Sequence, residues 1–306
     1  MMRSLPFLLI ACLTLALMAG EADAKEPEWS YTTGSYVRSV AISADGEYIA
    51  AGSGYPTGDK VYLFDKDSST PLWSYATGDQ VRSVAISADG EYITAGSDDD
   101  KVYLFGKDSS TPLWSYTTGN DVRSVAISAD GEYITAGSWD NKVYLFDKDS
   151  STPLWSYDTG SSVHSVAISA DGKYIAAGSG RFEVYLFDKN SNAPLWSYET
   201  RASPMRSVAI SADGEYIVAG ASDTNVYLFD KDNSTPLWNY ATGGSVVSVA
   251  ISADGQYIAA GSFDDKVYLF SKAGVGPGGD DNEFLPAPSL AASMATVAVI
   301  ALRRRY

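Results

Sequence analysis

Hydrophobic and polar positions alternate along this chain in short runs that recur at a nearly fixed interval. One copy extends over Trp73–Leu113, and its apolar runs are Leu72–Thr77, Val81–Ser87, Glu91–Gly96 and Lys101–Phe105. The runs are rich in Val, Ile, Tyr, Phe, Trp and Thr and are bounded by Ser, Asp, Asn and Gly, which favours β-strands joined by turns. None is long enough for an amphipathic helix, so an all-β fold is predicted.

Two sequence markers recur along the repeats. The first is a tryptophan at the start of each copy, with spacings of 44, 41, 41, 41 and 42 residues: Trp29, Trp73, Trp114, Trp155, Trp196 and Trp238. An Asp-Gly pair, typical of hairpin turns, also recurs six times: Asp45-Gly46, Asp89-Gly90, Asp130-Gly131, Asp171-Gly172, Asp213-Gly214 and Asp254-Gly255. A period of about 40 residues with four strands per copy is typical of a β-propeller. The prediction is a six-bladed β-propeller of four-stranded antiparallel blades over residues 25–272.

The phase of the repeat predicts how the ring closes. The strands of each blade are named a (VRSVAIS), b (EYITAGS), c (KVYLF) and d (PLWSY). The first d-type run, Trp29–Thr33, precedes any complete blade, and the last c-type run, Val267–Ser271, has no d run after it. Pairing of these two runs would complete the last blade and remove two exposed sheet edges.

The repeats resemble two known families. SVAISADGEYIAAGS followed by KVYLFD resembles the WD-repeat pattern, with Phe64-Asp65 where that family has Trp-Asp and Thr-Gly near the place of its Gly-His. The link FDKDSSTPLW resembles the tryptophan-docking link of quinoprotein-type propellers, in which Asp65 and Ser68 would brace the loop before Trp73. The resemblance implies the fold and leaves function open, because propellers host many activities. Of 21 tyrosines, 18 occupy three repeated positions and are expected to pack the blades.

The first 24 residues read as a secretory signal. Arg3 is followed by the apolar stretch Leu5–Met18 and by Ala22-Asp23-Ala24, a small-x-small cleavage pattern. An alternative is a lipoprotein signal with lipidation of Cys12, the sole cysteine. In either case the protein is expected to be exported.

Residues 273–288 form a Gly/Asp/Pro linker, and residues 289–306 join the apolar run Leu290–Leu302 to Arg303–Arg305. Thirteen helical residues rise about 20 Å, less than a bilayer core of about 30 Å. The tail therefore resembles a sorting signal of prokaryotic surface proteins, or serves as a short tilted membrane anchor. In both interpretations the arginines stay cytoplasmic and the propeller faces outward.

Charge and residue types limit the chemistry. The net charge of −16 disfavours nucleic-acid binding, which relies on Lys and Arg. His164 is the only histidine, which removes most acid–base and metal chemistry. Asp98-Asp99-Asp100 and Asp264-Asp265 lack the alternate-residue spacing of a Ca²⁺ loop and are expected to be solvated turn acids. We expect no metal, no cofactor and no catalytic residues.

Sequence variation between the copies is confined to one side. The a–b turns and c–d links are nearly constant, whereas the d–a and b–c turns vary, and blade topology places the two variable sets on one face. We call this the variable face and the opposite one the constant face. Large side chains in the variable turns are the predicted binding residues: Tyr36, Tyr55, Trp139, Arg181, Phe182 and Phe263. Stricter geometry of the constant turns is the alternative explanation.

Arginines near the start of strand a form a second candidate site at the channel mouth: Arg38, Arg82, Arg123 and Arg206. They would attract an anionic group, unless they pair locally with turn acids such as Asp79 or Asp121. The leading hypothesis is a non-enzymatic, monomeric cell-surface binding or scaffold module whose partner is a surface protein or glycan. The rivals are a quinone-dependent or carbohydrate-active enzyme and a purely structural surface-layer component.

Overall fold

The computed structural model describes residues 25–200 and 203–273. The predicted signal, nearly all of the linker and the C-terminal segment lie outside these residues. The chain divides after Ser30, and all strands belong to the unit that begins at Tyr31. The described residues form strands and turns with no helix, so the predicted all-β class is confirmed.

The strands fall into the four predicted roles. Strand a is β1 (Tyr36–Ile42), β5 (Val81–Ile86), β9 (Val122–Ile127), β13 (Val163–Ile168), β17 (Met205–Ile210) and β21 (Val246–Ile251). Strand b is β2 (Tyr48–Gly54), β6 (Tyr92–Ser97), β10 (Tyr133–Ser138), β14 (Tyr174–Ser179), β18 (Tyr216–Ala221) and β22 (Tyr257–Ser262). Strand c is β3 (Lys60–Asp65), β7 (Lys101–Gly106), β11 (Lys142–Asp147), β15 (Glu183–Asp188), β19 (Asn225–Asp230) and β23 (Lys266–Ser271). Strand d is β4 (Trp73–Ala76), β8 (Trp114–Thr117), β12 (Trp155–Asp158), β16 (Pro194–Glu199) and β20 (Trp238–Ala241).

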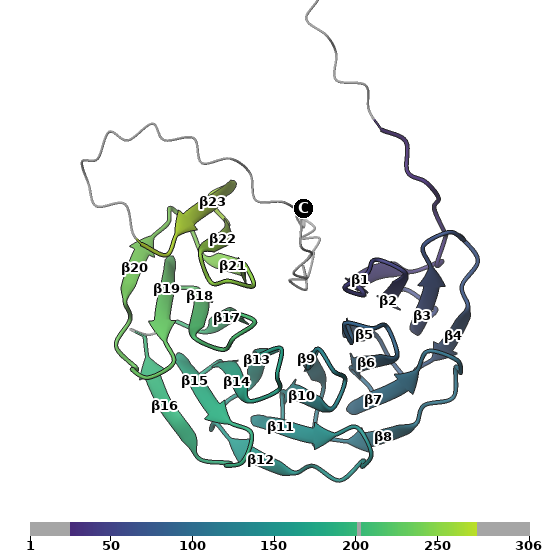
Figure 1. Cartoon of the computed structure of the whole chain (residues 1–306), viewed down its shortest axis with the longest axis horizontal. Helices are drawn as coiled ribbons and strands as arrows, with labels where there is room; N and C mark the ends of the chain where they lie inside the picture. The colour runs from purple at the N-terminus through teal and green to yellow at the C-terminus, as the bar shows by residue number, and fades with distance from the viewer. Residues whose placement is uncertain (1–24, 201–202, 274–306) are drawn as a thin grey trace, which may run out of the picture. The chain divides into compact units, whose positions relative to one another are not determined.

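These strands make six antiparallel sheets, which we number as blades 1 to 6 in chain order. Five have four strands, and the last, β21-β22-β23, has three. Figure 1 shows the sheets following one another around a common centre, with strand a innermost and strand d outermost. This is the arrangement of a β-propeller with six blades, as the repeat predicts.

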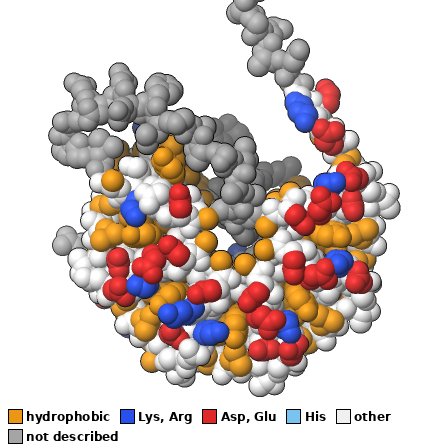
Figure 2. Space-filling view, in the orientation of Figure 1, with side chains coloured by type: hydrophobic (Ala, Val, Ile, Leu, Met, Phe, Trp, Pro, Cys, Tyr) orange, Lys and Arg blue, Asp and Glu red, His pale blue; other side chains and the backbone are white. Residues whose placement is uncertain are grey.

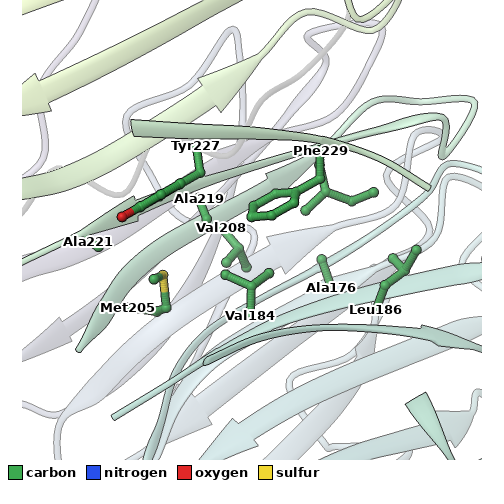
Figure 3. Close-up of a cluster of buried hydrophobic side chains, with 10 residues drawn as sticks. Ala176, Val184, Leu186, Met205, Val208, Ala219, Ala221, Tyr227 and Phe229 are labelled. Atoms are coloured by element: carbon green, nitrogen blue, oxygen red, sulfur yellow. The ribbon is translucent and has the colours of Figure 1, made fainter. Parts of the chain in front are cut away.

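The hydrophobic core lies between adjacent blades. Figure 3 shows one such layer, in which Val184 and Leu186 of β15 face Met205, Val208 and other side chains of the next blade. Strand c is buried on both sides in the central blades, and the Val, Leu and Phe of its Val-Tyr-Leu-Phe run are fully buried in blades 2 to 5. The continuous apolar run of this strand is therefore explained by contact with neighbours on both faces.

Each tryptophan of strand d docks on the following blade. The indole Nε1 of Trp73 donates to the Lys107 carbonyl at 2.7 Å, and its ring lies 5.2 Å from that of Phe105. Trp114, Trp155 and Trp196 repeat the hydrogen bond at 2.7–2.8 Å. In the link before Trp73, the Asp65 carboxylate accepts from the Asp67 amide. The interface therefore repeats from blade to blade.

A chain of backbone hydrogen bonds joins the turns of the constant face. Ala44 N donates to Ala88 O at 2.8 Å, Ala88 N to Ala129 O at 2.9 Å, and the series continues through Ala170 and Ala212 to the last blade. Within each turn the glycine has positive φ, for example +74° at Gly90. The positive φ restricts the residue at the last position of each Ser-Ala-Asp-Gly turn.

The two ends of the blade series expose surfaces that the other blades bury. Val267 and Leu269 of β23 are 84 and 73 % exposed, whereas their counterparts in the other blades are fully buried. Val40 of β1 is 40 % exposed, whereas Val84 of β5 is fully buried. In the described part of the chain, Trp29–Thr33 forms no strand and β23 has no outer partner, so the predicted closure stays a prediction.

Tyr31 nevertheless packs as a d-strand tyrosine does. Its ring meets Phe64 at 5.3 Å and 63°, and the corresponding pair of Tyr75 with Phe105 has 5.3 Å and 61°. Thr33 Oγ1 donates to the Ser35 carbonyl at 2.6 Å, as Thr77 Oγ1 does to that of Asp79. Residues 31–33 therefore lie against blade 1 as an outer strand of a preceding blade would.

Candidate functional site

Every strand a contains a β-bulge at the position of the predicted arginines. In blade 2, Val81 pairs with Ser97 and Ser83 with Gly96, which leaves Arg82 as the extra residue. Val81 and Val84 are both fully buried, and the bulge brings both side chains onto the interface while redirecting Arg82. The same bulge recurs in the other blades, and its residues are Arg38, Arg82, Arg123, His164, Arg206 and Val247.

Asp98 in the b–c turn of blade 2 joins two of these bulge residues. Its carboxylate side chain is 8 % exposed and accepts from Arg82 Nε at 2.7 and 2.8 Å. Arg123 NH1 of blade 3 lies 3.3 Å from the same carboxylate and 3.7 Å from that of Asp121. Burial, with Arg82 next, lowers the pKa of Arg123, and burial, with Asp98 next, raises the pKa of Asp121. Arg82 and Arg123 therefore pair locally with turn acids. The partner of Arg82 is Asp98 and not Asp79.

The other two arginines have no carboxylate partner among the described residues. Arg38 NH2 donates to Gln80 Oε1 at 3.0 Å, and its Nε is buried with no hydrogen-bond partner in the described chain. Arg206 is exposed and its Nε donates to Ser222 Oγ at 2.8 Å. His164 is partly buried, and burial, with the charges of Arg206 and Arg123, lowers its pKa.

The predicted binding aromatics lie at the variable face of four blades, Tyr36 at the start of β1 and the others in turns. Tyr36 and Tyr55 are 42 and 56 % exposed and bring their rings within 6.0 Å of each other on blade 1. Trp139 on blade 3 is 36 % exposed, and the Arg123 guanidinium stacks 4.0 Å from its ring centre. Phe263 on blade 6 is 51 % exposed. The geometry defines one aromatic pair and separate aromatic side chains on other blades.

Arg181 and Phe182 lie in the b–c turn of blade 4, where the order of basic and acidic residues is the reverse of that in blade 3. In blade 3 this turn carries Asp140 and Lys142, and the carboxylate of Asp140 accepts from the Tyr144 hydroxyl. In blade 4 Arg181 and Glu183 stand at these positions, and Glu183 accepts from the Tyr185 hydroxyl. The result is a polar hollow of about 350 Å³ on blades 3 and 4, lined by Tyr157, Thr159, Arg181, Glu183, Tyr185, Ser197 and Glu199. Phe182 is half-buried, with φ +76°.

Charged side chains elsewhere are spread over the surface. Figure 2 shows acidic and basic groups intermingled with hydrophobic ones on the visible face, and Lys148 and Lys231 each pair with two carboxylates. Within residues 25–200 and 203–273, no three His, Cys, Asp or Glu side chains gather as a metal site requires. A search of the same residues for a helix long and apolar enough to cross a membrane finds none.

The fold and its repeats define a β-propeller repeat protein. A solved structure described as "Crystal Structure of Mitotic Checkpoint Complex" matches with a TM-score of 0.67 and 20 % identity, covering 78 % of both chains. A family model for the WD domain, G-beta repeat, matches residues 26–65. The family model described as "Outer membrane protein assembly factor BamB", a PQQ-type repeat, matches residues 57–169 and 139–276. The chain therefore belongs to this PQQ-type repeat family. No match is found among curated protein sequences.

Sequence reasoning missed the partners of the bulge residues. Asp98, Gln80 and Ser222 contact Arg82, Arg38 and Arg206. The turn residues carry no signal for these contacts, because the residue two places after the strand-b glycine differs among the four blades whose bulge residue is arginine. The residues are Gly54, Asp98, Trp139 and Ser222.

Proposed function

We propose that this protein is a non-enzymatic binding or scaffold module that uses the variable face of its propeller. The supporting observation is the exposure of Tyr55, Trp139 and Phe263 in turns of that face and of Tyr36 at the start of β1. Aromatic side chains and arginines dominate the energetics of protein interfaces. Arg123 already stacks on Trp139, so one ring face is held in place before a partner arrives, which lowers the entropy cost of binding.

Partner capture by the purified protein tests this proposal. Trp139→Ala should weaken capture of a surface partner about tenfold or more, because a buried interface aromatic contributes about 2 kcal/mol. The matched control is Leu113→Ala, which removes a 56 % exposed apolar side chain from a c–d link on the constant face. Equal loss with both variants, or loss of several kcal/mol of stability with Trp139→Ala alone, would refute the assignment.

We further propose that the protein is exported and held at the cell surface with the propeller outside. This rests on the signal-like residues 1–24 and on the apolar run and arginines of 289–306. Protease treatment of intact cells should release the propeller while Arg303–Arg305 stay inside. Cleavage only after lysis would reverse this topology.

A further inference from the structure

Blade 4 lacks an aspartate that other blades place beside the tyrosine of strand c. In blade 2 the Asp99 carboxylate accepts from the Tyr103 hydroxyl at 2.6 Å and from the Gly78 amide at 2.7 Å. It therefore joins the b–c turn to the d–a turn that precedes the blade. The aspartates of blades 3, 5 and 6 that accept from the strand-c tyrosine in the same way are Asp140, Asp223 and Asp264. Blade 4 has Arg181 at this position.

The polar hollow of blades 3 and 4 lies where this link is missing. Arg181 extends over the d–a turn, where its NH1 lies 3.0 Å from the Cβ position of Gly160. The donors that the aspartate would satisfy have other partners: the Gly160 amide donates to Asp158 Oδ1 at 2.8 Å, and the Tyr185 hydroxyl donates to Glu183. The hollow of about 350 Å³ is thus bordered by Arg181 and Glu183 without leaving these two donors unpaired.

Strands β15 and β16 contribute two acids to the wall of the hollow. Glu183 pairs in register with Glu199, and Tyr185 pairs with Ser197. Like charges directly opposite each other destabilise a strand pair. The corresponding pairs of blades 2 and 3 are Lys101 with Thr117 and Lys142 with Asp158. Blade 4 therefore carries an acidic pair that strand pairing does not favour.

The charged groups of the hollow do not satisfy one another. Arg181 and Glu199 are both exposed, and neither makes a hydrogen bond or ion pair with any residue that the structure describes. A guanidinium only donates and a carboxylate only accepts, whereas a hydroxyl does both. A cationic ligand would meet Arg181, and an anionic ligand would meet two carboxylates. The lining therefore favours an uncharged ligand with several neighbouring hydroxyl groups.

We propose that the polar hollow binds an uncharged sugar residue of a glycan. Arg181 donates to the sugar hydroxyls, and Glu183 and Glu199 accept from them. A volume of about 350 Å³ is at the lower end of the range of about 300–1,000 Å³ for small-molecule sites, which fits a short saccharide. Arg181 lies in a b–c turn and Thr159 in a d–a turn, so the hollow belongs to the variable face. The inference rests on the proposed function and deepens it by assigning a glycan as the partner.

Ligand-observed saturation-transfer NMR with the full-length protein tests the site. The probes are the methyl glycosides of glucose, galactose, mannose and N-acetylglucosamine, and acetate and methylguanidinium are the charged competitors. At least one glycoside should bind saturably and should not be displaced by either competitor at equal concentration. Binding of none of the four glycosides, or displacement by a charged competitor, overturns the proposal.

Variants locate the binding. Arg181→Asp combined with Glu183→Lys restores the pattern of Asp140 and Lys142 in blade 3 and leaves the net charge unchanged. This variant should raise the dissociation constant of the bound glycoside at least about tenfold, because charge-assisted hydrogen bonds are lost. Glu199→Ala should also weaken binding, whereas Glu132→Ala, the same substitution in an a–b turn, should leave it unchanged. Equal effects of the two alanine variants overturn the site, whether or not the double variant folds.

Partner capture separates this proposal from the one it rests on. If Trp139→Ala prevents capture and no glycoside binds, the variable face stands as the binding face and the sugar site falls. If a glycoside binds and the double variant loses both the glycoside and the partner, the sugar site and the binding face are both supported. If a glycoside binds while Trp139→Ala captures the partner as the unaltered protein does, the sugar site stands and the aromatic residues fall.

Discussion

Closure of the blade series by residues 29–33 makes a register-specific prediction. In blades 1 to 3 the first residue of strand c pairs with the last residue of strand d, as in Lys101 with Thr117. The same register pairs Lys266 with Thr32. Thr32→Cys and Lys266→Cys, in a protein with Cys12 replaced by Ala, should form a disulfide, because paired strands bring Cα atoms within the required 4.4–6.8 Å.

The stabilisation from closure follows from exposed area. Val267 and Leu269 are 84 and 73 % exposed, and their counterparts in the preceding blade, Val226 and Leu228, are fully buried. Burial of an aliphatic side chain contributes about 1.5–3 kcal/mol, so these two together contribute roughly 3–6 kcal/mol. Deletion of residues 25–34 should lower the free energy of unfolding by this amount and promote aggregation through the free edge of β23.

Mass spectrometry of the oxidised double variant and thermal unfolding of the deletion protein are the assays. Thr32→Cys with Ser271→Cys, at the far end of β23, is the matched control and should stay reduced. The closure hypothesis is refuted if the Thr32 and Lys266 cysteines do not cross-link while the deletion protein remains monomeric with an unchanged melting temperature.

The remaining predictions concern single residues. Asp98→Ala should lower the free energy of urea unfolding by about 2 kcal/mol, because it removes the carboxylate partner of Arg82 and one of the two carboxylates beside Arg123. Asp149→Ala, at an exposed ion pair, should lower it by under about 0.5 kcal/mol. Gly90→Ala should lower the free energy of unfolding more than Gly34→Ala. Both glycines have positive φ, but of the two only Gly90 would bring a Cβ against a neighbour, Tyr48 Cδ2. Equal losses of unfolding free energy in the two variants would contradict this. The lowered pKa of His164 means that the unfolded chain binds the proton first, so stability should be full above about pH 6.5 and fall as pH drops below it; His164→Gln should remove this slope, and an unchanged slope would show that other groups cause it.

The strands and turns were predictable because each repeat combines period-2 alternation with a turn glycine. The predicted run Val81–Ser87 corresponds to β5, which ends at Ile86, and Lys101–Phe105 corresponds to β7, which ends at Gly106. Each Asp-Gly glycine has the positive φ that the turn requires, for example +77° at Gly46. Because the same runs and turn residues recur in six repeats, a strand that is uncertain in one repeat is identified by its counterparts in the others.

The site was less predictable because its contacts join different blades. A bulge leaves no mark in composition, so the sequence did not show that Arg82 and Arg123 are redirected toward a shared carboxylate. Local spacing suggested Asp79, three residues before Arg82, but Asp98 reaches both arginines from the end of the paired strand β6. Pairing of this kind depends on register and on the neighbouring blade, neither of which a single repeat encodes.

The alanine-to-alanine hydrogen-bond chain of the constant face has a consequence for how such proteins change. Each link uses only backbone atoms, from one Ser-Ala-Asp-Gly turn to the next, so it does not depend on which blade follows which. Exchange, duplication or reordering of blades would therefore keep this hydrogen bond between neighbours. Each blade would carry its own d–a and b–c turns to the new position. The residues of the d–a and b–c turns take no part in the alanine-to-alanine links, so these turns can diverge in sequence while the links between blades are kept.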